Sequence, residues 1–177
     1  MVKRSYLFIE GTTDTSNGNL REGFNKLLVK KLEGKMPTIS MGDGKKQTID
    51  KFKNSSNSNM LCDLDASEAK ITDDLKENEI SEFKDSVFYM IQEMEAWFIS
   101  QPEILDNFYN FDISKRLVKK HASLFEEPDK ELQRITKDTA KKAYHKVNHG
   151  AQLLKLLDIE KLMRDFPEFR RLIEKLK

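Results

Sequence analysis

NMLCDLDAS, residues 59–67, begins as a short apolar segment and ends in two acids, Asp63 and Asp65, one residue apart. The apolar part is typical of a buried β-strand. Because side chains alternate along an extended strand, we expect both carboxylates to lie on the same side. In open α/β sheets, ligands bind outside the carboxyl ends of the strands. The pattern therefore predicts a ligand site where this strand ends.

A strand-like segment near the N-terminus also ends in an acid. Residues 5–9 are mainly aromatic or aliphatic, and Glu10 follows them directly. The chain between the two segments is long enough for a crossover, so we expect parallel neighbouring strands. Carboxylates are good ligands for Mg²⁺ or Mn²⁺. Glu10, Asp63 and Asp65 are therefore predicted to share one divalent-metal site, with Glu95 as a candidate ligand of a second ion.

Strand and helix signals alternate through the first hundred residues. Further strands are predicted at 37–41 and 87–91. This alternation predicts an α/β fold with a mostly parallel four-stranded sheet flanked by helices. Beyond residue 100 the pattern becomes helical. We therefore expect an α/β core over 1–100 and a C-terminal helical extension over 101–177 that packs on it.

Two helices carry distinctive signals. Asn19 followed by Glu22 forms a capping-box pattern at the start of one of them. The other is predicted over 129–149, where an apolar stripe faces a basic one. The basic stripe consists of Lys142, His145, Lys146 and His149. It is either a solvated helix face or a phosphate-contacting surface, made by Lys142, Lys146 and His149, for DNA or RNA. A zinc site using the two histidines is a third, weaker interpretation.

The composition restricts the classes of protein. With 31 basic and 30 acidic residues, the formal net charge is +1, so the chain as a whole does not attract nucleic acid. The single cysteine, Cys62, excludes a disulfide framework and is expected in the core, as are Trp97 and Phe98. No apolar segment approaches the roughly 20 residues of a membrane span, and no signal-peptide pattern is present. A cytoplasmic protein without membrane contact is expected.

Four short motifs, taken in order, resemble a known domain. They are FIEG at 8–11, LCDLD at 61–65, EMEAW at 93–97 and YHKVNHG at 144–150. The series resembles the Toprim domain and is similar to a bacterial Toprim-like family often encoded beside ABC/SMC-type ATPases in anti-phage, abortive-infection loci. The resemblance spans nearly the whole chain. It implies a Rossmann-like Toprim fold, a Mg²⁺- or Mn²⁺-dependent nuclease acting on DNA or RNA, and an ABC/SMC-type ATPase as partner. The implied catalytic residues are Glu10, Asp63, Asp65, Glu95 and Lys146, with Glu10 also serving as general acid or base.

Other interpretations stay open. The acids can simply cap loops and helix starts. The chain can also be a non-catalytic Toprim-like subunit that docks an ATPase or nucleic acid. Many Toprim enzymes carry a second glutamate shortly after Glu-Gly, whereas here the nearest acid is Asp14. Finally, DLDAS at 63–67 resembles the Asp-x-Asp-x-Thr signature of phosphatases that use an aspartyl nucleophile, although that motif normally follows the first strand.

Overall fold

The computed structural model describes residues 5–13 and 19–177. Within them the chain builds a four-stranded, all-parallel sheet in the order β2-β1-β3-β4. The strands are β1 (Tyr6–Ile9), β2 (Thr38–Met41), β3 (Ser58–Asp63) and β4 (Val87–Met90). The predicted α/β fold with a parallel four-stranded sheet is confirmed. β1 and β3 are the two interior strands, so their carboxyl ends lie at the middle of one sheet edge.

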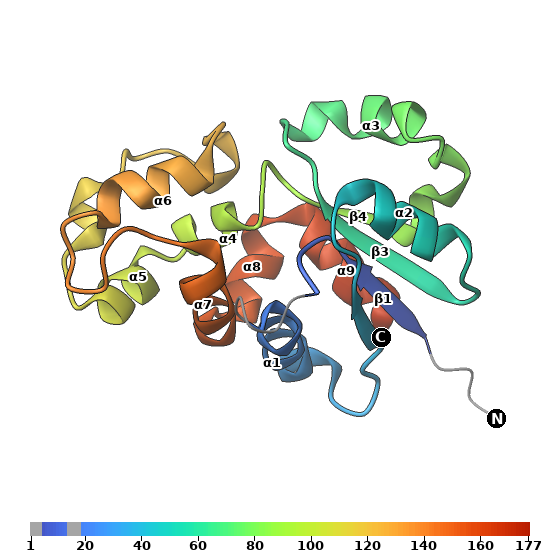
Figure 1. Ribbon diagram of the computed structural model, residues 1–177, viewed down its shortest axis with the longest axis horizontal. Helices are drawn as coiled ribbons and strands as arrows, with labels where there is room; N and C mark the ends of the chain where they lie inside the picture. The colour runs from blue at the N-terminus through green and yellow to red at the C-terminus, as the bar shows by residue number, and fades with distance from the viewer. Residues whose placement is uncertain (1–4, 14–18) are drawn as a thin grey trace.

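Helices cover both faces of the sheet (Figure 1). They are α1 (Leu20–Leu32), α2 (Lys45–Lys53), α3 (Ile71–Glu77), α4 (Glu95–Ile99), α5 (Pro102–Tyr109), α6 (Pro128–Thr136), α7 (Ala151–Leu156), α8 (Ile159–Asp165) and α9 (Pro167–Leu176). Short helical turns are η2 (Glu68–Lys70), η3 (Ser81–Ser86), η4 (Ile113–Arg116), η5 (Ala122–Leu124) and the π-turn η6 (Lys146–Gly150). In the described part of the chain, no helix combines the length and the apolar character needed to cross a membrane.

Alternation along the strands divides the core into two clusters. Leu7 and Ile9 of β1 belong to the cluster that contains the apolar residues of α1, α7, α8 and α9. Phe8, between them, points to the other face, where it shares a cluster with Cys62 and residues of α2. Cys62 is buried, as predicted, and so are Trp97 and Phe98. The strands are apolar on both faces because helices cover both faces.

α1 begins at the predicted cap. The side chain of Asn19 accepts a hydrogen bond from the backbone N–H of Glu22 at 2.9 Å, which satisfies one of the free donors at the helix start. α1 crosses α7 closely at Gly23, where an added Cβ would lie 3.0 Å from Cα of Ala151. This contact packs α7, from the last third of the chain, directly against α1, one of the helices that cover the sheet.

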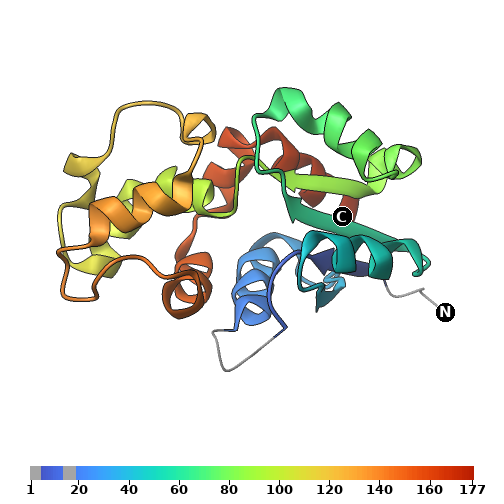
Figure 2. The same ribbon diagram turned by 45° about the horizontal axis from the view of Figure 1, so that its top comes forward.

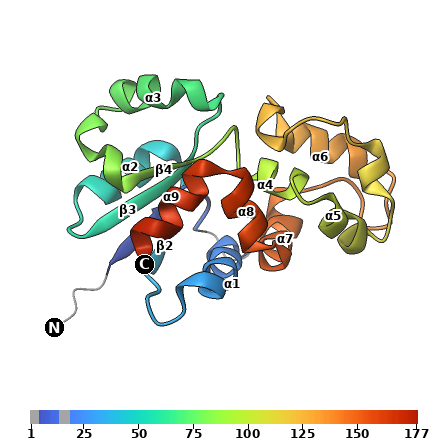
Figure 3. The ribbon, with the colours of Figure 1, turned by 180° about the vertical axis from the view of Figure 1, so that it is seen from behind.

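The residues after 100 separate into two parts. α5 and α6 stand beside the sheet as a second lobe, which Figure 2 shows clearly, while α8 and α9 return across the back of the sheet (Figure 3). Leu172 and Ile173 of α9 share a hydrophobic cluster with Leu7 of β1. Residues on both sides of position 100 thus share one of the two hydrophobic clusters, and the division into 1–100 and 101–177 stays a prediction.

The single helix predicted over 129–149 is wrong. α6 ends at Thr136, residues 137–145 are irregular, and the π-turn η6 follows. Thr136 explains the ending: its hydroxyl donates to the carbonyl of Leu132 at 2.6 Å and accepts from the backbone N–H of Tyr144 at 2.7 Å. A buried threonine that offers its hydroxyl to the backbone competes with continued helix. The chain folds back, and the predicted basic stripe does not exist as one helix face.

Candidate functional site

Glu10 and Asp63 lie next to each other where the two interior strands end. β1 and β3 pair in parallel with Ile9 opposite Leu61. The backbone N–H of Glu10 donates to the carbonyl of Leu61 at 2.9 Å. The carboxylate of Glu10 accepts from the backbone N–H of Asp63 at 3.1 Å. The structure therefore brings together the acids that end the two predicted strands.

Asp65 does not continue the strand. β3 ends at Asp63, and Asp65 has a left-handed backbone with φ of 58° and an exposed side chain. Its backbone N–H donates to the carbonyl of Gln92 at 2.7 Å. The expectation that strand alternation aligns Asp63 with Asp65 is thus wrong, because an αL residue turns the chain out of the extended conformation. Partial burial of its carboxyl group and the charge of Asp63 nevertheless raise the pKa of Asp65, so Asp63 acts electrostatically on Asp65.

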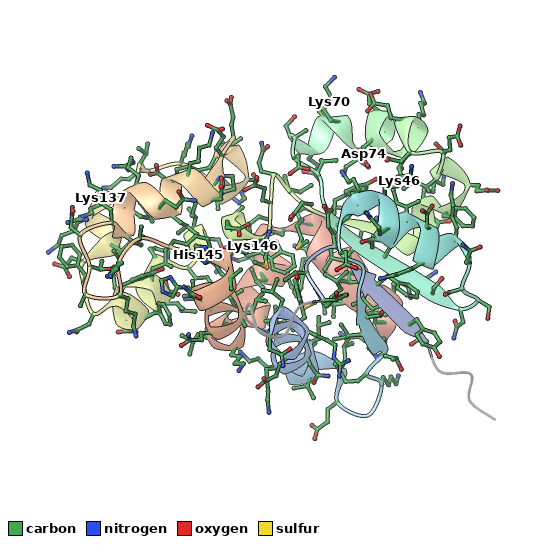
Figure 4. The ribbon with its side chains drawn as sticks, in the orientation of Figure 1. Lys46, Lys70, Asp74, Lys137, His145 and Lys146 are labelled. Atoms are coloured by element: carbon green, nitrogen blue, oxygen red, sulfur yellow. The ribbon has the colours of Figure 1, made fainter. Side chains whose placement is uncertain are left out.

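Lys146 lies between two buried acids on the other side of Asp63. Its Nζ is 3.5 Å from Oδ2 of Asp63 and 3.7 Å from Oε1 of Glu95. Each acid has a second partner: Oδ1 of Asp63 accepts from the backbone N–H of Met94 at 2.9 Å, and Oε1 of Glu95 accepts from the hydroxyl of Tyr144 at 2.8 Å. Figure 4 shows Lys146 in the middle of the molecule, between the sheet and the second lobe.

A cavity of about 300 Å³ opens at this place. Its walls come from the end of β3, the start of α4, the first turns of α6 and the segment around η6. The lining residues are Asp63, Glu93, Glu95, Asp129, Gln133, Tyr144, His145, Lys146 and Val147. Of the predicted site residues, Asp63, Glu95 and Lys146 thus meet in one cavity. Glu10 adjoins it through Asp63.

The sequence interpretation missed part of this cavity. Glu93 follows β4 and stands in the motif at 93–97, but it was not named as a site residue, although the rule of acids after strands that singled out Glu10 and Asp63 applies to it as well. Asp129 had no such signal, because it comes from the second lobe and reaches the cavity only through the tertiary fold. Tyr144 lies in the segment predicted as one helix over 129–149, which does not form. Its hydroxyl donates a hydrogen bond to the carboxylate of Glu95.

Burial and mutual repulsion hold several of these acids away from their ordinary pKa. Burial, with the charge of Asp63, raises the pKa of Glu10 to about 7. Burial, with the charge of Asp129, raises the pKa of Glu93 to about 7. Burial also raises the pKa of Glu95, against the opposing effect of Lys146. For Lys146 burial acts to lower the pKa, but the charges of Asp63 and Glu95 outweigh it and raise that pKa. The lysine is therefore protonated at neutral pH.

Residues 10–177 match the family described as Domain of unknown function (DUF4276). The chain belongs to the DUF4276 family. The matched range starts at Glu10 and takes in both strand-end acids and every lining residue of the cavity. No curated protein and no solved structure matches the chain.

The side chains of this DUF4276 chain suit a hard cation in donor type. Oε2 of Glu95 and Oε2 of Glu93 are buried and have no hydrogen-bond partner within the described residues. Buried carboxylate oxygens without partners fit a bound cation, which prefers oxygen ligands. Across 5–13 and 19–177, however, no three His, Cys, Asp or Glu side chains are grouped closely enough to hold a metal ion. The predicted metal ligands Glu10, Asp63 and Asp65 are not gathered around one point, and the ammonium of Lys146 supplies the nearby positive charge.

The other predicted contacts lie elsewhere. Lys142 is exposed, has a left-handed backbone with φ of 64° and is not among the cavity's lining residues. His149 is buried, with Nδ1 3.1 Å from the hydroxyl of Tyr109 and its ring against Phe108. His145 is exposed, so the two histidines of the zinc interpretation face different environments. Of the three predicted phosphate contacts, Lys146 lines the cavity and the other two do not. Asp14, weighed as a stand-in for a second glutamate, falls outside the described residues.

Proposed function

We propose that this DUF4276 chain is a metal-dependent nuclease that cleaves phosphodiester bonds of DNA or RNA. The observation that carries the proposal is the position of Asp63 at the carboxyl end of an interior parallel strand, with Glu10 on one side and Glu95 on the other. Ligand sites of open α/β sheets occupy this edge. The resemblance of the motifs to the Toprim domain supports the choice of nucleic acid as substrate.

The proposed roles follow the motif resemblance, since the predicted ligands are not gathered around one point among the described residues and a bound ion would have to draw them together. Asp63, Glu10 and Asp65 would hold Mg²⁺ or Mn²⁺, with Glu95 beside them; a bound ion supplies Lewis-acid stabilisation of the phosphate and activates water. Without a bound ion, burial and the charge of Asp63 raise the pKa of Glu10 to about 7; a Glu10 carboxyl that does not coordinate the ion would be suited to moving a proton at neutral pH. Lys146 is half-buried and protonated, which suits it to hold the negative charge of a phosphate.

An ABC/SMC-type ATPase as partner and anti-phage defence as setting belong to the same proposal and rest on the resemblance alone. They predict that hydrolysis by the isolated chain is weak and that a cognate ATPase with ATP increases it. Cleavage of a labelled substrate, measured with and without such an ATPase, tests this part. Equal rates in both conditions would remove the partner from the proposal and leave the chemistry in place.

The chemistry is tested by cleavage of supercoiled plasmid, single-stranded DNA and single-stranded RNA in Mg²⁺, in Mn²⁺ and in EDTA. Asp63→Asn removes the charge shared by both sides of the site while keeping its shape. Asp50→Asn is the matched control, because Asp50 is an exposed acid on α2. We expect metal-dependent cleavage by wild type and by the control and none by Asp63→Asn. Cleavage by all three at equal rates would contradict the proposal.

One observation favours a second candidate, the non-catalytic docking subunit. Lys146 pairs with both Asp63 and Glu95, so the fold neutralises part of its own acid cluster. A docking subunit would bind its ATPase or nucleic acid equally well after Asp63→Asn and would show no cleavage under any condition. Pull-down and cleavage assays on the same variant separate the two candidates.

The phosphatase interpretation gains nothing from the geometry. Both carboxylate oxygens of Asp63 are already engaged, one by the backbone N–H of Met94 and one by Lys146. An aspartyl nucleophile needs an oxygen directed at the phosphate. A phosphoenzyme trapped on Asp63 would revive this alternative.

A further inference from the structure

His149 is a buried histidine to which the proposed chemistry gives no role. Its ring packs among the rings of Phe108, Tyr109 and Tyr144, with centroid distances of 5.6 Å, 5.6 Å and 6.2 Å. Burying a polar ring costs free energy unless its nitrogens are hydrogen-bonded. Nδ1 has two such partners, the backbone N–H of His145 at 3.3 Å and the hydroxyl of Tyr109 at 3.1 Å.

The backbone partner fixes the protonation state of this ring. A backbone N–H can only donate, so Nδ1 carries no hydrogen and the proton of the neutral ring sits on Nε2. The hydroxyl of Tyr109 then also donates to Nδ1. Burial lowers the pKa of His149, and the charges of Lys141 and His145 act in the same direction. The ring is therefore neutral at neutral pH and available as an acceptor.

His149 binds both backbone polar groups of His145. The carbonyl of His145 accepts from the backbone N–H of His149 at 2.9 Å, while the N–H of His145 donates to the ring of His149. His145 stands directly before the π-turn η6, and the N–H groups at the start of a helical turn have no backbone acceptor within it. The imidazole thus satisfies a donor that the turn itself leaves free.

The residue that follows His145 is Lys146, whose ammonium faces the carboxylates of the cavity (Figure 4). A lysine side chain loses much rotamer entropy when it is held in one place, so the backbone that presents it has to be well fixed. Tyr144 is fixed by the hydroxyl of Thr136 and by burial. His145 is exposed, so its place depends on the hydrogen bonds to His149 rather than on burial. The imidazole is therefore the side chain that secures the backbone next to Lys146.

We infer that His149 is the positioning residue for Lys146. Its Nδ1 holds the N–H of His145 and thereby fixes the backbone from which Lys146 reaches the carboxylates of Asp63 and Glu95. His149 does not itself line the cavity, so it acts only through the turn. The inference rests on the proposed function for the use of Lys146 as a phosphate contact. The positioning itself needs neither a substrate nor a metal ion.

The test measures how fast the amine of Lys146 is acetylated by a succinimidyl ester in EDTA, relative to the exposed Lys142 of the same molecule, by peptide mass spectrometry. The proteins are wild type, His149→Phe, His149→Asn and the control His121→Phe. Phenylalanine keeps the aromatic packing without an acceptor, whereas asparagine offers an amide oxygen close to the position of Nδ1. His121 is an exposed histidine outside the turn.

In wild type, Lys146 should react about tenfold or more slowly than Lys142, because an ammonium held by two carboxylates must lose both its proton and its partners before it reacts. His149→Phe should raise this relative rate by about three- to tenfold, the effect of losing one hydrogen bond. His149→Asn and His121→Phe should match wild type. Lys45, half-buried and paired with Asp74 at 2.9 Å, should react equally slowly in every protein unless the whole fold opens.

An unchanged relative rate in a folded His149→Phe would overturn the inference, as would an equal rise in His149→Asn or in His121→Phe. If His149→Phe does not fold, NMR of the ring nitrogens of wild type decides: Nδ1 without hydrogen is expected, and a hydrogen on Nδ1 would overturn the inference. Nucleic-acid cleavage, assayed in parallel, separates the two ideas. A faster Lys146 in His149→Phe without cleavage by wild type rejects the nuclease alone, whereas cleavage by wild type with an unchanged Lys146 rate rejects the positioning alone.

Discussion

The two sides of Asp63 are built differently. On one side lie Glu10 and Asp65, which together with Asp63 are the strand-edge acids. Each of these acids ends its strand, β1 or β3, or follows it within two residues. On the other side lies the cavity group, Glu93, Glu95, Asp129 and Lys146, which is assembled from three segments that meet only in the folded chain. Asp63 belongs to both, through its backbone N–H on one side and its carboxylate on the other.

The difference lies in how each side handles negative charge. At the strand edge, Glu10 accepts a backbone N–H and carries a raised pKa of about 7, so a proton can relieve the repulsion. In the cavity, the ammonium of Lys146 adds to this relief, beside the raised pKa values of Glu93 and Glu95. A parallel sheet collects acids at its edge as a consequence of topology, but the counter-charge has to be supplied by a distant segment. The cavity group is therefore the part that depends on the complete fold.

The largest expected effect concerns the strand edge. Glu10→Gln should lower metal-dependent cleavage by on the order of 10²–10³-fold, because a lost metal ligand or proton-transfer group removes several kcal/mol of transition-state stabilisation. Asp65→Asn should lower it by about tenfold or less, because Asp65 is exposed and lies beyond the strand. Cleavage rates at saturating Mg²⁺ measure both. Equal losses would show that the exposed acid is as important as the one fixed against Asp63.

A smaller effect is expected where the cavity group depends on the second lobe. Thr136→Val removes the acceptor for the backbone N–H of Tyr144, which should lower the free energy of unfolding by about 1–3 kcal/mol. Urea denaturation measures it. Thr72→Val, an exposed substitution in α3, should change stability by no more than about 0.5 kcal/mol. Equal stability of the two variants would mean that the fold-back after α6 does not depend on Thr136.

The smallest effect is a dependence of stability on pH. Glu93 has its pKa raised from 4.5 to about 7 in the folded chain, so between these values the folded state retains a proton that the unfolded state releases. Stability from this group is complete below pH 4.5 and is lost as the pH rises through 7. Unfolding temperatures in EDTA at pH 5 and pH 8 should fall less in Glu93→Gln than in wild type. The exposed control Glu174→Gln should follow wild type, and an identical fall in all three proteins would contradict the assignment.

Much of the fold could be predicted because its signals are local. The four strands lie within two residues of the predicted segments, and the Asn19 cap forms as expected. The same local rule placed Glu10 beside Asp63. Prediction failed where tertiary contacts decide the backbone: Thr136 ends α6, and the chain after it forms a π-turn. It also failed at Asp65, because periodicity does not reveal an αL residue that ends a strand.

The cavity was partly predictable for the same reason. Lys146 was singled out twice, as a catalytic residue implied by the motif resemblance and as part of a basic helix face, and that helix face does not exist. Its actual partners, Asp63 and Glu95, are brought to it by the fold of α6 and η6. Asp129 shows the limit most clearly, since nothing near it in the sequence differs from an ordinary first-turn acid of a helix.

The central claim is that the carboxylates around Asp63 bind a divalent cation. Calorimetric titration of wild type, Asp63→Asn and Asp50→Asn with Mn²⁺ tests it most directly. The account predicts that wild type and Asp50→Asn bind Mn²⁺ with the same affinity, and that Asp63→Asn does not bind it, because Asp63 belongs to both sides of the site. Equal Mn²⁺ binding by all three proteins would contradict the account.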